Sequence, residues 1–429
     1  MAIDAEALIA RDSVETMVET FSRRVAKAKT NPDFPHSKLL HYQCMLDYFE
    51  RVANAKKNGQ PLAWIGLLFP PEILLAMDVV PFILDQYSIQ LIAMGRGFEY
   101  FDLGEGYGFD KESCSPHLAI IGGATVGLYP EPDMIVCAGP QPCDSQSTMF
   151  DVLADMTNAP TYWVNLPYRT DDEAVLYYRQ ELEGLANFLS EQTGRPFNHE
   201  KLREILEYGK KTQHYFLEIQ KLRNRIPSPI GCRDAFMFFG PRMGNEGTPE
   251  TLAFVKAQYE EIRERVERGE GAIPDERHRI VTNGAYPFWH MQLFDWMEKE
   301  YGAVVAVDLS NSYPLEPVGD TSDPLLCLAR KTIFSNVAVK TATMPYGWTA
   351  QHIGDKAKEL NCDACLFFAH FGCKHGCGRQ RVVVEEVRKR AGIPSLVLDI
   401  DAGNPAIVSA ATMRNKVHEY FTMLEARKS

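Results

Sequence analysis

Residues 362–401 read CDACLFFAHFGCKHGCGRQRVVVEEVRKRAGIPSLVLDID. The segment opens with an apolar run over 364–371, continues with an amphipathic stretch over 379–391, and closes with a second apolar run. Apolar strands separated by an amphipathic helix are typical of a parallel β-sheet that helices cover on both faces. The segment therefore predicts a strand–helix–strand unit of an α/β fold, with two cysteines in the turn after its first strand.

The same alternation of strand and helix patterns occurs in two parts of the chain. It runs from the apolar stretch 62–69 to a long helix pattern, and it restarts after NRIPSPIG, whose two prolines and glycine predict a hinge. A chain of 429 residues also exceeds what one hydrophobic core usually serves. We therefore predict an α/β protein with two doubly wound parallel-sheet domains of the flavodoxin or Rossmann type. The predicted boundaries are 1–58 for N-terminal helices, 59–228 for the first domain and 229–429 for the second.

Composition and charge limit the class of protein. The net charge of −12 argues against a nucleic-acid partner, because phosphates would be repelled. The N-terminal sequence carries acidic residues and has no basic stretch before an apolar core, so it does not match a secretory signal. The most apolar stretch, 62–84, is interrupted by acidic residues and prolines and does not match a membrane span. We expect a cytoplasmic protein with no membrane partner.

Three of the ten cysteines occupy one kind of position. Cys143 and Cys373 follow predicted strands, and Cys114 lies in a polar turn before an apolar helical run. Ligands of open α/β sheets bind beyond the carboxyl ends of the strands, where helix N-termini stabilise thiolates and anionic clusters. Cytoplasmic cysteines are mostly reduced, which favours metal or redox chemistry over disulfides. The three thiols are therefore candidate ligands of one metal centre.

Several kinds of centre are compatible with these cysteines. Zinc would need Cys373 and Cys377 together with nitrogen from His370, His375 or His117, and residues from three distant segments would have to converge, which makes a zinc site less specific. A cysteine nucleophile with a histidine base would not explain thiols at three strand ends. A 4Fe–4S cluster fits best, because three thiolates can hold it and leave one iron open for a ligand or substrate.

The remaining cysteines leave the ligand count open. Cys362 and Cys365 form a C-x-x-C that opens a strand rather than a helix, which favours a structural role. Four-cysteine ligation is the commoner arrangement. Candidates for a further ligand, each equally readable as a buried thiol, are Cys137, Cys232, Cys327 and Cys377. No G-x-x-x-x-G-K-S/T motif is present, so the chain does not match a P-loop ATPase.

Four segments resemble the 2-hydroxyacyl-CoA dehydratase / benzoyl-CoA reductase family. They are WIGLLFPPEILLAMDVVPF, ESCSPHLAIIG, PDMIVCAGPQPCDSQSTMFDVLADMTNAPTYWVNLPY and the opening segment 362–401. RNRIPSPIG and EGAIPDERHRIVTNGAYP are similar to the larger iron–sulfur subunit of benzoyl-CoA reductases. The resemblance covers about 35–425, and the order and spacing of the segments make it specific.

The resemblance implies an enzyme and its partners. The family's catalytic component pairs two related subunits, here a heterodimer or a homodimer, each with a cysteine-bound cluster in the cleft between its α/β domains. A separate iron–sulfur activator hydrolyses ATP and supplies one low-potential electron. The substrate is an acyl-CoA thioester, which dehydratases convert through a ketyl radical and aryl-CoA reductases reduce on the ring. Two other classes stay open: a non-catalytic electron-transfer or cluster-carrier protein, and a zinc-stabilised binding protein.

Carried over onto this chain, the resemblance implies Cys114, Cys143 and Cys373 as the cluster ligands. Cys377 and Cys232 depart from the family pattern and leave open a fourth ligand or a larger double cluster. Polar residues at the same predicted strand ends are candidates for acid–base catalysis or for hydrogen bonds to the cluster, because histidine titrates in the useful range. They are His117, Ser145, His370 and His375.

Overall fold

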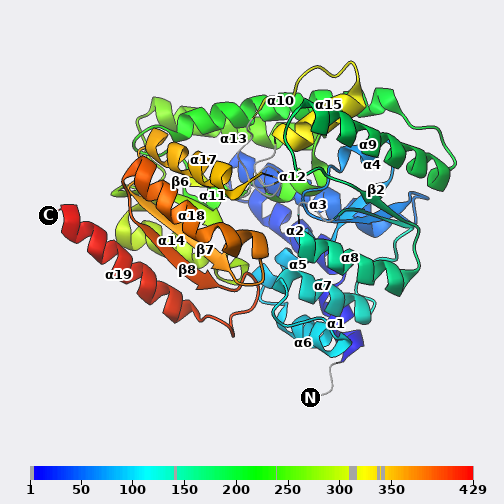
Figure 1. Ribbon diagram of the computed structural model, residues 1–429, viewed down its shortest axis with the longest axis horizontal. Coiled ribbons are helices and arrows are strands. Elements are labelled where there is room, and N and C mark those ends of the chain that lie inside the picture. Colours follow the sequence, from blue (N-terminus) through cyan, green and yellow to red (C-terminus); the bar gives the residue numbers. More distant parts are fainter. Residues whose placement is uncertain are drawn as a thin grey trace.

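The structure, a computed structural model, describes residues 4–139, 143–237, 239–308, 316–335, 339 and 344–428. Figure 1 shows two α/β lobes side by side, with the chain ends on different sides. The first lobe holds a sheet with the parallel order β2 (Val80–Ile83), β1 (Leu62–Ile65), β3 (Met134–Ala138) and β4 (Thr161–Val164). The second holds the parallel order β6 (Ala303–Asp308), β5 (His278–Gly284), β7 (Ala364–His370) and β8 (Ser395–Ile400). The predicted fold class of two parallel-sheet α/β units is confirmed.

Helices cover both faces of the first sheet because its strands are apolar on both sides. One face packs on α2 (Val14–Lys29), α3 (His36–Asn54), α5 (Leu84–Ala93), α7 (Ser115–Thr125) and α8 (Asp144–Thr157). The other packs on α4 (Glu72–Leu75), α9 (Asp172–Thr193), α10 (His199–Arg223) and α15 (Pro324–Phe334). The small helices α1 (Ala5–Asp12) and α6 (Phe98–Tyr107) lie at the lower end of this lobe (Figure 1).

The second sheet is covered in the same way. One face packs on α14 (Gln292–Tyr301) and α19 (Ala410–Lys428), and the other on α17 (Tyr346–Glu359) and α18 (Lys374–Ala391). The connecting elements are α11 (Cys232–Ala235), α12 (Phe239–Asn245), α13 (Pro249–Glu267) and the 3-10 turn η1 (Phe288–His290). Helices α10 and α13 pack on each other along the top of Figure 1. No helix of the described residues is long and apolar enough to cross a membrane.

The chain crosses between the lobes more than once. After β6 it returns to the first lobe, where Leu325 and Leu328 of α15 join the core beneath α9 and α10. It then enters the second lobe again through α17. The predicted domain boundaries stay predictions, and α15 lies with the first sheet although its residues fall in the predicted second domain.

His41 gives the fold a testable dependence on pH. Its ring packs edge-on against Phe254 with centroids 5.6 Å apart, and its Nδ1 is buried with no hydrogen-bond partner among the described residues. Burial, assisted by the charges of Arg24 and Lys38, lowers the pKa of His41 to about 4. The unfolded chain protonates this ring near its ordinary value, so the free energy of unfolding should fall by up to about 3 kcal/mol as the pH drops from about 6.5 to 4.

Thermal unfolding across that range would measure the effect. The unfolding midpoint of the His41→Phe variant should fall less steeply with decreasing pH than that of the original protein, because phenylalanine cannot be protonated. If the unfolding midpoints of the two proteins change with pH in parallel, His41 does not contribute to the pH dependence of stability.

Candidate functional site

Three cysteines begin three helices. Cys114, Cys143 and Cys373 are the N-cap residues of α7, α8 and α18. Cys143 follows the carboxyl end of β3, and Cys373 follows that of β7. The Cys373 thiol accepts a hydrogen bond from the Gly376 N–H at 3.3 Å. The first turn of a helix has N–H groups without partners inside the helix, so each thiol lies in a field that favours negative charge.

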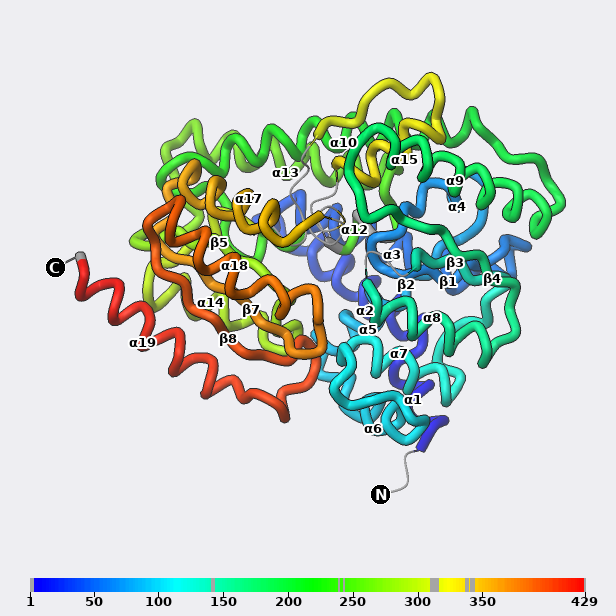
Figure 2. The backbone as a smooth tube through the Cα atoms, in the orientation of Figure 1, coloured from blue at the N-terminus to red at the C-terminus, as the bar shows by residue number. Residues whose placement is uncertain are grey.

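The loops that carry these cysteines touch each other across the two lobes. A Cβ atom at Gly372 would lie 2.9 Å from the Cys114 Cα, so only glycine permits this approach. The Gly403 N–H donates to the Ser115 Oγ at 2.9 Å. Figure 2 shows the loop after β7 approaching the α5 and α7 region. The carboxyl ends of the two sheets therefore meet at the starts of α7 and α18.

The thiols are close enough to influence one another electrostatically. Burial raises the pKa of Cys114 well above its ordinary value, and Cys143 and Cys373 raise it further. Burial, and then Cys373, raises the pKa of Cys143 to about 12. These two thiols would be protonated at neutral pH in the metal-free chain, and binding a cation would release their protons.

The three thiols can be compared with the ligands that metal ions and iron–sulfur clusters require. Among the described residues, no group of three or more His, Cys, Asp or Glu side chains could hold a metal ion. The thiolates of an iron–sulfur cluster bind different iron atoms, so they lie farther apart than ligands that share one ion. Three mutually interacting thiols at helix starts fit such a group.

A hydrogen-bonded chain of three polar side chains lies beside these cysteines. The His117 Nδ1 is 2.8 Å from the Ser145 Oγ, and its Nε2 is 2.9 Å from the Asp85 Oδ1. Asp85 also accepts hydrogen bonds from the Leu67 N–H and the Gln146 amide. Burial would raise the pKa of Asp85, but the hydrogen bonds, above all that of His117, outweigh burial and lower it. Asp85 is therefore an anion that accepts the proton of His117 Nε2.

His370 and His375 lie near Cys373 in different surroundings. His370 ends β7, is 1% exposed, and accepts a hydrogen bond from the Ala402 N–H at its Nδ1. Its Nε2 and the Nδ1 of His375 are buried without a hydrogen-bond partner among the described residues. Burial lowers the pKa of both histidines; Asp401 opposes this at His370 and Asp144 opposes it at His375. Both rings are thus suited to be neutral. Because the His370 Nδ1 already accepts a hydrogen bond, the proton of a neutral His370 lies on Nε2, which can donate.

Two of the further cysteine candidates, Cys377 and Cys232, lie in different places. The Cys377 thiol donates to the His370 carbonyl at 3.2 Å, and burial followed by Cys373 raises its pKa, so Cys377 belongs to the same neighbourhood. Cys232 is fully buried in α11, where its sulfur contacts the Ala303 carbonyl and the Val305 N–H of β6. Ala303 begins β6, so Cys232 lies near the amino end of the second sheet, whereas Cys373 lies beyond the carboxyl end.

Sequence reasoning missed three charged residues near these side chains. Asp85 follows β2 and Asp401 follows β8, so the strand-end rule applied to these two strands would have found both. Arg379 lies inside α18 and is 8% exposed, and no sequence pattern marked it as buried.

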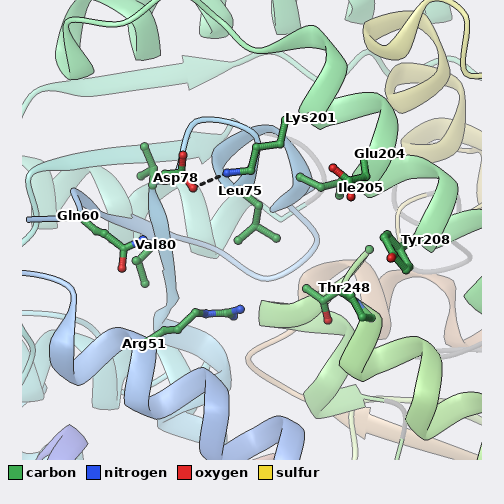
Figure 3. Close-up of a pocket in the computed structure, with 13 residues that line it drawn as sticks. Arg51, Gln60, Leu75, Asp78, Val80, Lys201, Glu204, Ile205, Tyr208 and Thr248 are labelled. Atoms are coloured by element: carbon green, nitrogen blue, oxygen red, sulfur yellow. Dashed lines mark hydrogen bonds and ion pairs between the residues drawn. The ribbon is translucent and has the colours of Figure 1, made fainter. Parts of the chain in front are cut away.

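A separate cavity of about 300 Å³ lies at the other end of the first sheet (Figure 3). Its walls include Arg51, Val80, Lys201 and Thr248, with an ion pair between Lys201 and Asp78. Val80 is the first residue of β2, so this cavity is at the amino ends of the strands. It contains none of the predicted site residues.

Known proteins match the chain along most of its length. The sequence model of the family described as 2-hydroxyglutaryl-CoA dehydratase, D-component, matches residues 67–424. The (R)-phenyllactyl-CoA dehydratase alpha subunit of Clostridium sporogenes is 21% identical, over 93% of this chain and 98% of that protein. A benzoyl-CoA reductase subunit of Thauera aromatica is 22% identical, over 94% of this chain and 98% of that protein. The alpha subunit of (R)-2-hydroxyglutaryl-CoA dehydratase of Acidaminococcus fermentans is 22% identical, over 69% of this chain and 61% of that protein.

Proposed function

Since the chain belongs to the 2-hydroxyglutaryl-CoA dehydratase D-component family, we propose that it is the iron–sulfur subunit of a 2-hydroxyacyl-CoA dehydratase or benzoyl-CoA reductase-type enzyme. The family resemblance predicted from the sequence is confirmed, and its relatives are dehydratase and reductase subunits. The proposed substrate is an acyl-CoA thioester. The main observation that supports a cluster is that Cys114, Cys143 and Cys373 lie at three helix starts and influence one another electrostatically.

These three thiols would hold a 4Fe–4S cluster, with Cys377 as the nearby candidate for a fourth ligand or a larger double cluster. When bound, the cluster supplies low-potential one-electron transfer. If the enzyme is a dehydratase, one electron would reduce the thioester carbonyl to a ketyl radical anion, which would expel the C2 hydroxyl as hydroxide, lose a C3 proton and then give the electron back. In a ring reductase, electrons and protons add to the acyl group instead.

Other chains complete the proposed system. The relatives are named as subunits, which supports a related second subunit, either a different chain or a second copy of this one. The electron would come from a separate iron–sulfur activator that hydrolyses ATP. A non-catalytic cluster carrier is the second candidate function, and turnover of a thioester would separate the two.

The chain's own residues would manage the proton. Asp85 accepts a hydrogen bond from the His117 Nε2–H. The Nδ1 of the neutral ring is therefore free to accept a hydrogen bond from the Ser145 hydroxyl. A proton taken up by Ser145 from the substrate side would therefore pass to His117, and Asp85 would stabilise the resulting imidazolium. His370 and His375 are further candidates for proton transfer beside Cys373, because each has a buried ring nitrogen without a partner among the described residues. His370 could donate from Nε2, since its Nδ1 already accepts the Ala402 N–H.

Reconstitution would test the proposal directly. The chain is purified and incubated with ferrous iron and sulfide without oxygen, and its iron, sulfide and zinc are then measured. About four iron and four sulfide per chain are expected. Turnover is measured next with the partner subunit, a reduced activator, and a panel of 2-hydroxyacyl and aromatic CoA thioesters. Stoichiometric zinc without sulfide would refute the proposal, and a cluster without turnover of any thioester would favour a carrier.

The Asp85→Asn variant tests the proton path. An amide would donate to His117 Nε2 and force its proton onto Nδ1, so the ring could no longer accept from Ser145. We expect kcat to fall about 10²-fold, with iron content unchanged. The exposed Asp102→Asn variant is the matched control and should keep full activity. Equal activity of both variants, with equal iron, would exclude this proton path.

A further inference from the structure

Arg379 is a buried cation without a carboxylate partner. It lies in the second turn of α18 and is 8% exposed. One guanidinium nitrogen donates to the Asn283 Oδ1 at 3.1 Å, and its Nε has no hydrogen-bond partner in the described part of the chain. None of the ion pairs between described residues includes this arginine. Removing such a charge from water is costly unless an anion compensates it.

The rest of the chain offers no missing carboxylate. The segments outside the described residues are 1–3, 140–142, 238, 309–315, 336–338, 340–343 and 429, and none of them contains aspartate or glutamate. An acidic side chain of this polypeptide therefore does not neutralise Arg379. The compensating anion must be a deprotonated group of another kind or a bound species.

The immediate surroundings identify the anion. Arg379 lies between the end of β5, where Asn283 is located, and the start of α17, where Tyr346 contacts the neighbouring Gly378. Burial lowers the pKa of Arg379, and the anionic forms of Cys373, the N-cap residue of the same helix, and then of Tyr346 oppose that shift. Tyrosine is normally neutral near pH 7, so the remaining source of negative charge is Cys373 when its sulfur is bound to metal. A thiolate is the form in which cysteine binds metal.

We propose that Arg379 is the fixed counter-charge of the iron–sulfur cluster held by Cys373, which makes it a positioning residue that sets the cluster's reduction potential. This inference rests on the proposed function. A thiolate-bound cluster is anionic, and each electron it accepts adds one negative charge. A buried cation beside it therefore stabilises the reduced form more than the oxidised form. Arg379 would raise the midpoint potential and slow the loss of iron.

The experiment compares reconstituted original protein with Arg379→Gln, Arg379→Lys and the control Arg381→Gln. Arg381 lies on the same helix, and its side chain is 87% exposed. An anaerobic redox titration followed by electron paramagnetic resonance measures the midpoint potential, and a chelator measures iron release. For Arg379→Gln we expect a tenfold lower ratio of reduced to oxidised cluster at a given potential, which is about 59 mV for one electron. Iron release should be several-fold faster.

The controls separate charge from structure. Arg379→Lys keeps the charge and should restore most of the potential, and Arg381→Gln should match the original protein. Without metal, Arg379→Gln should melt at an equal or higher temperature, because a buried unpaired charge is removed. If Arg379→Gln binds a cluster with unchanged potential and iron release, or if Arg379→Lys is as low in potential as Arg379→Gln, the inference is overturned. Absence of iron and sulfide from the original protein would instead refute the proposed function.

Discussion

The Cys143→Ala variant is expected to lose its cluster and with it at least about 10³-fold of the enzyme's turnover, because the cofactor carries the one-electron chemistry. Iron should fall from about four atoms per chain to less than one after reconstitution, since only two of the three proposed thiolate ligands would remain. The Cys143 side chain makes no capping hydrogen bond at the start of α8. Alanine therefore removes the thiol without removing a helix cap, and the fold should be unaffected.

The matched control for this variant removes a thiol elsewhere. Cys327 is buried in α15 and lies in the core beneath α9 and α10. The Cys327→Ala variant should bind full iron and turn over normally, with only a small loss of thermal stability. Equal iron and sulfide in Cys143→Ala and Cys327→Ala would show that Cys143 is not a ligand.

Cys377 decides whether three or four protein thiols hold the cluster. Its thiol points to the His370 carbonyl, to which it donates a hydrogen bond. Serine can keep that hydrogen bond, so the Cys377→Ser variant isolates the role of sulfur. We expect it to retain most of its iron, because three ligands leave one iron open for substrate. Loss of iron equal to that of Cys143→Ala would establish a fourth ligand.

The opening segment shows what the sequence could predict and where it was limited. The strand was predicted well, because a continuous apolar run defines a buried strand. Strand β7 ends at His370, one residue before the predicted end. Helix α18, however, begins at Lys374 rather than at residue 379. The glycines at 376 and 378 favoured a loop, but the Cys373 side chain caps the helix, and Gly378 fits beneath the Tyr346 ring. That ring belongs to another helix, so the helix pattern alone could not reveal it.

Contacts between the lobes were the least predictable part of the site. The strand-end rule gave the positions of Cys143 and Cys373 on their own sheets. It could not show that Gly372 packs on Cys114, because that contact depends on how the two sheets face each other. The return of α15 to the first lobe could not be predicted for the same reason. An amphipathic helix pattern shows that a helix is partly buried, but it does not identify the surface that covers it.

Lys331 of α15 forms buried ion pairs that attach this helix to the first lobe. Its side chain is 14% exposed, and its ammonium pairs with two carboxylates, Glu72 of α4 and Glu246, the latter at 3.1 Å. The Glu72 side chain is 1% exposed, and its Oε2 has no hydrogen-bond partner among the described residues. Lys331→Met would leave two buried carboxylates without this cation. Breaking a buried pair by removing one partner costs about 3 kcal/mol, so the midpoint of thermal unfolding should fall by several degrees.

A double-mutant comparison would separate the charge from the packing of the lysine stem. If the loss comes from the buried carboxylates that no longer contact the Lys331 ammonium, adding Glu72→Gln to Lys331→Met should restore part of the stability, because one of the two charges is removed. The exposed pair of Lys416 and Asp399 supplies the control, and Lys416→Met should change stability by less than about 1 kcal/mol. Equal effects of Lys331→Met and Lys416→Met, or additive effects of the two buried changes, would mean that the buried cation does not hold α15 to the first lobe.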